Sequence, residues 1–274
     1  MPYQLLAVDY DNTLVPFGKT GPRPAVAEGI RRMQAGGGRL VVCTGRCLAA
    51  LNAAGAWRQG LRYDYAVCSN GACVVDSAGT VLAKTPLTGE DMYALVDFCE
   101  DDDYPLEFAF SDGYYAYIGY EDLRRYYGDL SQTGLIVHDG EDQDRHLTEM
   151  PTAAFLAMPD GAPARFAAKY GYLGIVFVPL HAGYRPGWTV YDVMHRGVNK
   201  GLGLQGLCRA IGVPPEQVAA AGDGANDLEL LQAAGLGCAM GNAVPGLKAA
   251  ADRVLDDVRA EGLAPLLAEL WPPV

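Results

Sequence analysis

The sequence lacks any long apolar stretch. Its longest apolar runs, at residues 39–43, 152–158 and 174–180, are much shorter than the roughly 20 residues that a membrane-spanning helix needs. The first nine residues have no basic cluster ahead of an apolar run, so we expect no signal peptide. The sequence therefore predicts no membrane partner.

Basic residues are also scarce. Lys and Arg number 21 against 33 Asp and Glu, which gives a formal net charge of −12. Proteins that bind nucleic acids or anionic membranes need a basic face, so we expect no nucleic-acid partner. An anionic substrate would need a local positive group or a metal ion to offset this charge.

Cysteines are present, but not in the pattern of a disulfide framework. The seven are an odd number, and no two form a CxxC pair. In a chain of this length such usage predicts reduced thiols and a cytoplasmic protein. No segment indicates an obligate protein partner.

Strand and helix patterns alternate in both terminal parts of the 274-residue chain. Short, continuously apolar segments are typical of strands buried on both faces of a parallel sheet, and helical segments lie between them. This order predicts an α/β fold with a doubly wound, Rossmann-like parallel-sheet core. The predicted strands are residues 4–8, 39–43, 65–68, 218–221, 237–240 and 253–255, and the main predicted helices are 24–35, 48–59 and 200–211.

The middle of the chain has a different pattern. Residues 87–189 hold 11 of the 16 tyrosines. Thr88 and Asp91 have the spacing of a capping box, and residues 106–110 and 114–119 alternate around a short turn as in an antiparallel hairpin. We therefore expect a core of residues 1–86 and 190–274 with an inserted α+β domain at 87–189.

Two aspartates follow the first predicted strand. Asp9 and Asp11 are two residues apart, so both side chains can point to the same side of the chain as it leaves the sheet. Carboxylates that close repel each other unless a cation lies between them. A divalent metal ion would keep Asp9 ionised as a nucleophile and leave Asp11 free to carry a proton. The alternative is a polar strand exit in which Asp11 caps a turn.

Polar residues also follow the second and third strands and begin a later helix. The Thr44 hydroxyl and nearby backbone N–H groups can hold a phosphate oxygen, with Gly45, Arg46 and Asn70 as further candidates for phosphate or substrate binding. Lys200 opens a predicted helix, against the helix dipole, and its ammonium can bridge a carboxylate and a phosphate. The alternatives are an ordinary turn at Thr44 and solvated surface positions for Arg46 and Lys200.

The segment at residues 222–227 is the most specific of the four. Asp223 leaves a strand of very small residues, and Asn226 and Asp227 follow at a helix start. Oxygen ligands with room for water suit Mg²⁺. An Asx-rich helix N-cap is the alternative, but it explains only one of these acids.

Together these segments resemble the motifs of the haloacid dehalogenase superfamily of phosphotransferases: DYDNT at 9–13, Thr44 in CTGR, Lys200 in GVNKG, and GDGAND at 222–227. The continuation through CAMGNA at 238–243 is similar to the Cof-like hydrolases, which carry a large α+β cap where residues 87–189 lie. The chain departs from the usual pattern at Asn12, where Gly is usual, and at Gly224, where Ser is common. Neither position supplies the chemistry.

The resemblance implies a phosphatase. Asp9 would attack phosphorus to form an aspartyl-phosphate, and Asp11 would protonate the leaving oxygen and then take a proton from water. Thr44 and Lys200 would bind phosphate oxygens.

The resemblance also implies Mg²⁺ as cofactor. Asp9, Asp11 through its backbone carbonyl, and Asp223 would hold it, with Asp227 and Asn226 in support. A phosphomutase, or a signalling module that is phosphorylated on aspartate, stays open as an alternative.

The substrate is expected to be a small phosphorylated metabolite. Tyr114, Tyr115 and Tyr117 around the predicted hairpin, with Arg185 in a later turn, favour a sugar or polyol phosphate, and a flat ring phosphate such as a flavin or pyridoxal phosphate comes second. The alternative is that Tyr115 and Tyr117 point inward as the core of the insert.

Overall fold

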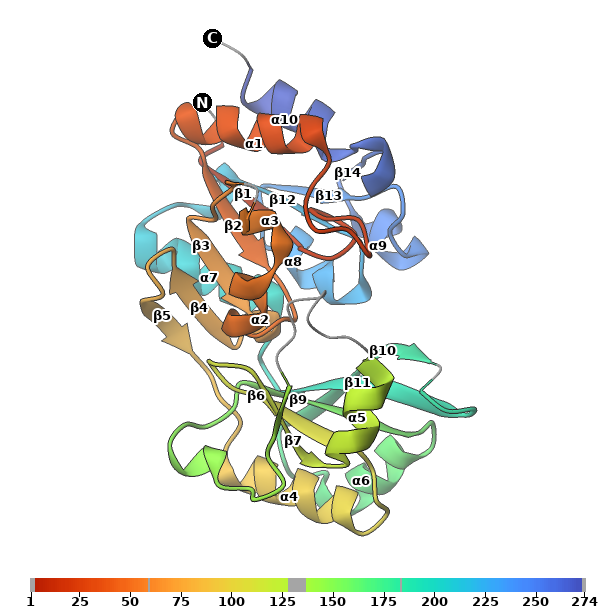
Figure 1. The fold of residues 1–274 in the computed structure, drawn as a ribbon. Helices are drawn as coiled ribbons and strands as arrows, with labels where there is room; N and C mark the ends of the chain where they lie inside the picture. The colour runs from red at the N-terminus through yellow and green to blue at the C-terminus, as the bar shows by residue number, and fades with distance from the viewer. Residues whose placement is uncertain (1–2, 59, 128–136, 183, 273–274) are drawn as a thin grey trace. The chain divides into compact units, whose positions relative to one another are not determined.

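The chain forms two compact units. The computed structural model describes residues 3–58, 60–127, 137–182 and 184–272 (Figure 1). Unit 1 comprises Met1–Arg46, Ala54–Lys84 and Asn199–Val274, and unit 2 comprises Cys47–Ala53 and Thr85–Val198. The insert thus extends beyond the predicted 87–189, and a short segment of the predicted core also belongs to unit 2.

Unit 1 is built on an eight-stranded sheet in the order β14-β13-β12-β1-β2-β3-β4-β5. The first six strands in that order run parallel. They are β14 (Arg253–Val254), β13 (Leu236–Ala239), β12 (Val218–Gly222), β1 (Leu5–Val8), β2 (Arg39–Cys43) and β3 (Tyr65–Cys68). Every residue of β1 and β12 is buried, as expected for strands covered on both faces. Two strands that the sequence did not predict, β4 (Cys73–Asp76) and β5 (Val81–Lys84), extend the sheet in antiparallel fashion.

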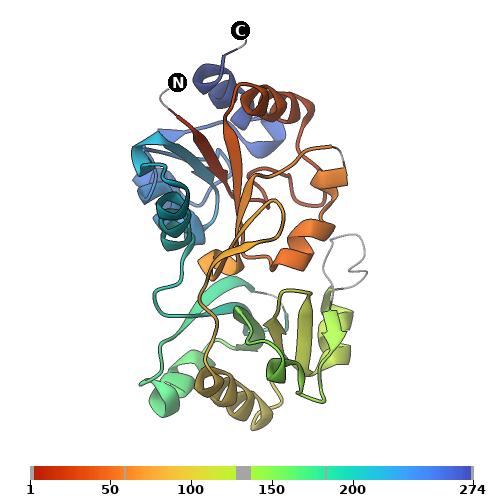
Figure 2. The same ribbon diagram turned by 90° about the vertical axis from the view of Figure 1, so that its left-hand side faces the viewer.

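Helices cover both faces of this sheet, which confirms the predicted doubly wound core (Figure 2). Helix α1 (Pro24–Ala35) begins with proline, which fits the first helical turn, and it packs against α10 (Leu263–Leu270). Helices α7 (Lys200–Ile211) and α8 (Leu228–Gln232) pack together, and α9 (Pro245–Ala250) follows β13. The helix predicted at 48–59 is instead two short helices, α2 (Leu48–Ala53) and α3 (Gly55–Arg58); residue 59 lies outside the described residues.

Unit 2 has a six-stranded sheet in the order β10-β11-β9-β6-β7-β8. The strands are β10 (Ile175–Ala182), β11 (Trp188–His195), β9 (Ala153–Pro159), β6 (Leu106–Ala109), β7 (Tyr114–Ile118) and β8 (Val137–Asp139). All neighbouring pairs are antiparallel except β7 and β8. The predicted hairpin is β6–β7, whereas the predicted boundary at residue 190 falls inside β11.

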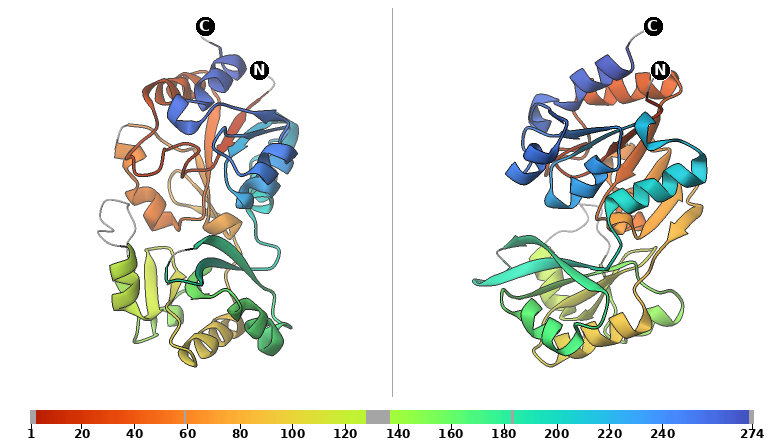
Figure 3. Two further views of the ribbon diagram at one scale, coloured as in Figure 1. Left: turned by 90° about the vertical axis from the view of Figure 1, so that its right-hand side faces the viewer. Right: turned by 180° about the vertical axis from the view of Figure 1, so that it is seen from behind.

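The two faces of this sheet have different coverings. Helices α4 (Gly89–Glu100) and α6 (Ala162–Tyr170) pack on one face through a large apolar cluster, and α5 (Tyr120–Tyr127) follows β7 (Figure 3). The Thr88 hydroxyl accepts from the Asp91 N–H at 3.1 Å, and the Asp91 carboxylate accepts from the Thr88 N–H at 2.8 Å, which confirms the capping box. On the opposite face, Ala50 of α2 and Cys47, which directly precedes the helix, pack into a second cluster with Ala109, Tyr114, Ala153 and Met194.

The apolar segments of the chain lie inside these units. No helix among the described residues is long and apolar enough to cross a bilayer. All seven cysteines are buried, and burial raises the pKa of the Cys238 thiol to about 11. Buried thiols with raised pKa values fit small apolar residues of the core.

Candidate active site

The predicted motif residues meet at one edge of the unit 1 sheet. β1 pairs with β12 on one side and β2 on the other, all three parallel. Asp9, Thr44 and Asp223 each follow the carboxyl end of one of these strands. In open α/β sheets this edge, beside the point where the strand order reverses, is where ligands bind.

Lys200 joins two of the predicted acids. Its Nζ donates to Asp9 Oδ1 and to Asp227 Oδ1, both at 2.6 Å. Helix α7 begins at this lysine, and the Asn199 side chain caps the helix by accepting from the Leu202 N–H at 2.8 Å. Only 1% of the Lys200 side chain is exposed, so the two carboxylates replace water around its ammonium.

Burial and neighbouring charges shift the pKa values of Lys200, Asp9 and Asp223. Burial alone would lower the pKa of Lys200, but Asp227 and Asp9 outweigh it and hold that pKa above its ordinary value. Burial raises the pKa of Asp9 well above its ordinary value, and Lys200 opposes this rise only in part. Burial likewise raises the pKa of Asp223 to about 6. The three carboxylates thus carry more negative charge than Lys200 neutralises.

Asp227 organises the loop after β12. Its Oδ2 accepts the N–H groups of Asp223 at 3.0 Å and Gly224 at 2.9 Å. A Cβ on Gly222 would lie 2.4 Å from the Cβ of Asp227, so only glycine lets this side chain pack beneath the end of β12. Both Asp227 oxygens are therefore engaged by protein donors.

Asp223 has weaker partners. Its Oδ1 accepts from the Thr13 hydroxyl at 2.8 Å, and its Oδ2 accepts from Asn242 Nδ2 at 3.3 Å. Asn242 also donates to the Asn12 carbonyl at 2.9 Å and accepts from the Val258 N–H at 2.9 Å. The sequence analysis assigned no role to Thr13 or Asn242; the signals were the threonine of DYDNT and the asparagine of CAMGNA.

The donor set fits a hard divalent cation. Asp9, Asp223 and Asp227 each offer a carboxylate oxygen, and these atoms lie within 4.8 Å of one another. Oxygen donors of this kind suit Mg²⁺, whose charge would offset the excess negative charge. The Asp11 carboxylate is not in this cluster, so only its backbone carbonyl stays as the expected ligand.

Asp11 is paired with Arg46. The guanidinium donates from Nε to Asp11 Oδ2 at 2.9 Å and from a terminal nitrogen to Oδ1 at 2.8 Å. It also stacks over the Tyr10 ring, 5.0 Å from the centroid. The backbone N–H of Arg46 donates to the Thr44 hydroxyl at 3.1 Å, with Gly45 between the two residues. Arg46 thus contacts the predicted proton donor, and it is not a solvated surface residue.

The backbone at Asn12 explains why the chain departs from the usual motif. Asn12 has φ of 60°, in the left-handed region that glycine adopts without strain and asparagine tolerates better than most residues. Its side chain accepts from the Phe17 N–H at 3.1 Å. Asparagine therefore supports the same turn and adds a hydrogen bond to it.

Asn70 and Asn226 contact each other. Asn226 Nδ2 donates to Asn70 Oδ1 at 2.9 Å, which connects the end of β3 to the loop after β12. The Asn70 N–H donates to the Thr44 carbonyl at 3.0 Å. The structure thus brings together residues from all four predicted segments, in two connected groups: Asp9 with Lys200, Asp223 and Asp227; and Asp11 with Thr44, Arg46, Asn70 and Asn226.

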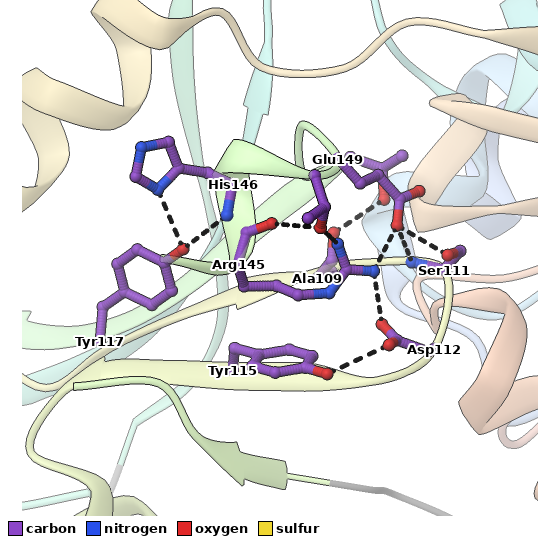
Figure 4. A network of polar contacts seen from close by, with 10 residues as sticks. Ala109, Ser111, Asp112, Tyr115, Tyr117, Arg145, His146 and Glu149 are labelled. Carbon is purple, nitrogen blue, oxygen red and sulfur yellow. Dashed lines mark hydrogen bonds and ion pairs between the residues drawn. The ribbon is translucent and has the colours of Figure 1, made fainter. Parts of the chain in front are cut away.

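The tyrosines of the β6–β7 hairpin divide between the two faces of the unit 2 sheet. Figure 4 shows Tyr115 beside Arg145, with its hydroxyl donating to Asp112 at 3.1 Å, and Tyr117 accepting from the His146 N–H at 3.1 Å. Both rings belong to the side packed by α4 and α6, so here the inward-pointing alternative is correct. Tyr114 lies on the other face with α2. Arg185 is paired with Asp122 at 2.9 Å.

Comparison with known proteins shows the family to which this chain belongs. Residues 6–267 match the family of haloacid dehalogenase-like hydrolases. A phosphoglycolate phosphatase of Methanopyrus kandleri is 45% identical over 84 residues, which span 31% of this chain and 36% of that relative. The pyridoxal phosphate phosphatase YbhA of Escherichia coli is 27% identical over 281 residues, which span 96% of this chain and 97% of that relative.

A solved structure confirms the predicted fold class. The HAD subclass IIB sugar phosphatase BT4131 superposes with a TM-score of 0.80 at 22% identity, covering 98% of this chain and 100% of that one. The family match spans both units and includes all four motif segments. The chain belongs to the haloacid dehalogenase-like hydrolases.

Proposed function

We propose that this protein is a Mg²⁺-dependent phosphatase that hydrolyses a small phosphorylated metabolite through an aspartyl-phosphate on Asp9. One observation carries the proposal: the buried Lys200 ammonium lies between Asp9 and Asp227, and Asp223 completes an oxygen cluster at the ligand-binding edge of the sheet. A buried lysine with two carboxylates at 2.6 Å is costly unless the group has a task.

The residues divide the work as follows. Asp9 uses a carboxylate oxygen to attack phosphorus, and the P–O bond to the leaving group breaks. Asp11 gives its proton to the departing oxygen and then removes a proton from the water that hydrolyses the aspartyl-phosphate. Lys200 and Thr44 hold the phosphoryl oxygens, where the charge of the transition state gathers.

Asp9, Asp223 and the Asp11 carbonyl would hold Mg²⁺, and the ion would supply positive charge to the phosphoryl oxygens. Asp227 supports this group because its oxygens orient Lys200 and the loop at Asp223 and Gly224. The raised pKa of Asp9 fits this role, because a nearby cation would restore its ionised, nucleophilic form.

For the substrate we propose a sugar or polyol phosphate first, and a flat ring phosphate such as pyridoxal phosphate second. The sugar phosphatase with the same fold supports the first choice, and the full-length pyridoxal phosphate phosphatase relative supports the second. We further propose that unit 2 acts as the cap that selects the leaving group, and that the enzyme works in the cytoplasm without an obligate partner.

The direct test is release of inorganic phosphate from a panel of phosphate esters with Mg²⁺ and with a chelator. We expect steady multiple turnover that needs Mg²⁺ and disappears in Asp9→Asn. Asp142→Asn, the same change at an exposed aspartate, serves as the matched control and should keep full activity. Full activity in chelator would refute the metal assignment, a single turnover would indicate a signalling module, and dependence on a bisphosphate would indicate a phosphomutase.

A further inference from the structure

The segment after β13 holds the loop that carries Asp223. The Met240 N–H donates to the Gly222 carbonyl at 2.9 Å, and the Val244 N–H donates to the Asp223 carbonyl at 3.0 Å. Between these two backbone contacts lies Asn242, whose Nδ2 donates to Asp223 Oδ2 at 3.3 Å. One short segment therefore holds both the backbone and the carboxylate of Asp223, and all of these residues belong to unit 1.

Asn242 also contacts the loop after β1. The same Nδ2 donates to the Asn12 carbonyl at 2.9 Å. Asn12 directly follows Asp11, whose backbone carbonyl is an expected metal ligand. A single amide group thus connects the two loops from which Asp223 and the Asp11 carbonyl would reach the ion.

The amide of Asn242 is itself held in place. Its Oδ1 accepts from the Val258 N–H at 2.9 Å. A Cβ on Gly241 would lie 2.6 Å from the Asp257 nitrogen, so the backbone beside Asn242 packs directly on the segment that carries this N–H. Because an amide is planar and both its oxygen and its nitrogen are engaged, these hydrogen bonds fix its orientation.

The hydrogen bonds to Asp223 leave room for a cation. Thr13 donates to Oδ1 and Asn242 donates to Oδ2. Each oxygen of an ionised carboxylate can accept about two partners, so these bonds orient the carboxylate and still leave positions for a metal ion. Groups that hydrogen-bond a metal ligand in this way set its direction, and their loss weakens metal binding.

We propose that Asn242 is a positioning residue that orients the Asp223 carboxylate and the Asn12 loop for the divalent cation. This inference rests on the proposed function. Mg²⁺ needs a near-octahedral set of oxygens at short distances, whereas Ca²⁺ accepts variable numbers and geometries. A misdirected Asp223 carboxylate should therefore weaken the binding of Mg²⁺ more than that of Ca²⁺.

The chain provides a matched control in Gln34. Its Nε2 also donates to one backbone carbonyl and one carboxylate, those of Arg62 and Asp64, both at 2.9 Å. Asp64 directly precedes β3, and its carboxylate accepts from the Leu40 N–H near the start of β2, at the end of these strands opposite to the site. Alanine at either position removes the same kinds of hydrogen bond, but only Asn242→Ala removes them beside the candidate metal ligands.

The first readout is the dissociation constant of each ion, obtained from the rise of Tm with the concentration of Mg²⁺ or Ca²⁺. We expect Asn242→Ala to raise the Kd of Mg²⁺ by about tenfold and that of Ca²⁺ by less than about threefold. Gln34→Ala should leave both constants unchanged. A role in stability alone would lower the Tm in chelator and leave the ratio of the two constants as it is in the wild type.

The second readout uses the wild-type protein, so it does not depend on how well a variant folds. In ¹⁵N-labelled protein the side-chain amide signals of Asn242 and Gln34 report the surroundings of each amide. We expect Mg²⁺ to shift the Asn242 signal and to leave the Gln34 signal in place.

An unchanged ratio of the two dissociation constants in Asn242→Ala, an equal change in Gln34→Ala, or an unshifted Asn242 amide would overturn the role of Asn242 and leave the phosphatase intact. If Mg²⁺ does not raise the Tm of the wild type, the metal assignment of the proposed function fails and the role of Asn242 fails with it. If the wild type binds Mg²⁺ but turns over no ester, the proposed function fails, and the ratio of the constants still decides whether Asn242 positions Asp223.

Discussion

Asp223 should couple the stability of the protein to pH and to Mg²⁺. Burial raises its pKa from an ordinary value near 4 to about 6 in the metal-free protein. A carboxyl group with a raised pKa stabilises the folded state fully below its unfolded pKa, and that contribution is lost as pH rises through the folded value. The metal-free protein should therefore lose stability between about pH 4 and pH 7 because of this group.

The size of the effect follows from the shift. Two pKa units correspond to about 3 kcal/mol, and partial exposure of the side chain reduces this to about 2 kcal/mol. For a chain of this size that is on the order of 5 °C in Tm. Asp223→Asn cannot ionise, so in chelator the variant should gain about this much over the wild type as pH rises from about 4.5 to about 7.5.

Mg²⁺ should reverse this difference in stability between Asp223→Asn and the wild type, because the ion binds the ionised carboxylate. We expect the ion to raise the Tm of the wild type more at about pH 7.5 than at about pH 5, and to have little effect on Asp223→Asn at either pH. Thermal unfolding followed by circular dichroism, with and without chelator, measures all of these quantities. A wild-type and variant difference that does not change with pH, or an equal response of both proteins to Mg²⁺, would refute the reasoning.

Three further predictions concern the neighbouring residues. Asp9→Asn and Asp11→Asn should each lower turnover by at least about 10³-fold without changing the Tm much, and only Asp9→Asn should abolish the covalent phosphate seen by mass spectrometry. Lys200→Met leaves two buried carboxylates without their ammonium, so it should cost on the order of 3 kcal/mol in urea unfolding, and an unchanged midpoint would contradict the buried pair. Asn12→Gly should keep activity within about threefold, whereas Asn12→Val should lower the Tm by several degrees, because a β-branched residue is strained at this positive φ.

The sequence was most informative where a short apolar strand ends in polar residues. The strands at Leu5–Val8, Arg39–Cys43 and Val218–Gly222 were predicted almost to the residue, because continuous burial requires continuous apolar character. Because neighbouring parallel strands end at the same edge of the sheet, the residues that follow them lie close together. The position of the candidate site could therefore be predicted from the order of the strands. The same reasoning missed β5, whose four residues are all exposed and show no such pattern.

Other errors arose where tertiary contacts override local pattern. The region 48–59 has a helical composition, yet it divides near Gly55, where a Cβ would lie 2.4 Å from the Thr20 carbonyl oxygen. The predicted boundary at 190 falls inside β11, which continues in the unit 2 sheet to His195. Neither contact can be read from the spacing of residues along the chain.

The roles of Asp223 and Asp227 show most clearly what spacing leaves open. Both acids follow β12 in one short loop, and the resemblance implied that Asp223 holds the metal ion and Asp227 supports it, without showing what that support consists of. In the structure Asp227 uses one oxygen for Lys200 and the other for two backbone N–H groups, so its charge is already compensated. Among the described residues, the Asp223 carboxylate accepts hydrogen bonds from a hydroxyl and a more distant amide, and burial raises its pKa to about 6. A cation should therefore bind more strongly to the Asp223 carboxylate than to that of Asp227. Loss of the Asp223 side chain should weaken metal binding more than loss of the Asp227 side chain, which should mainly displace Lys200.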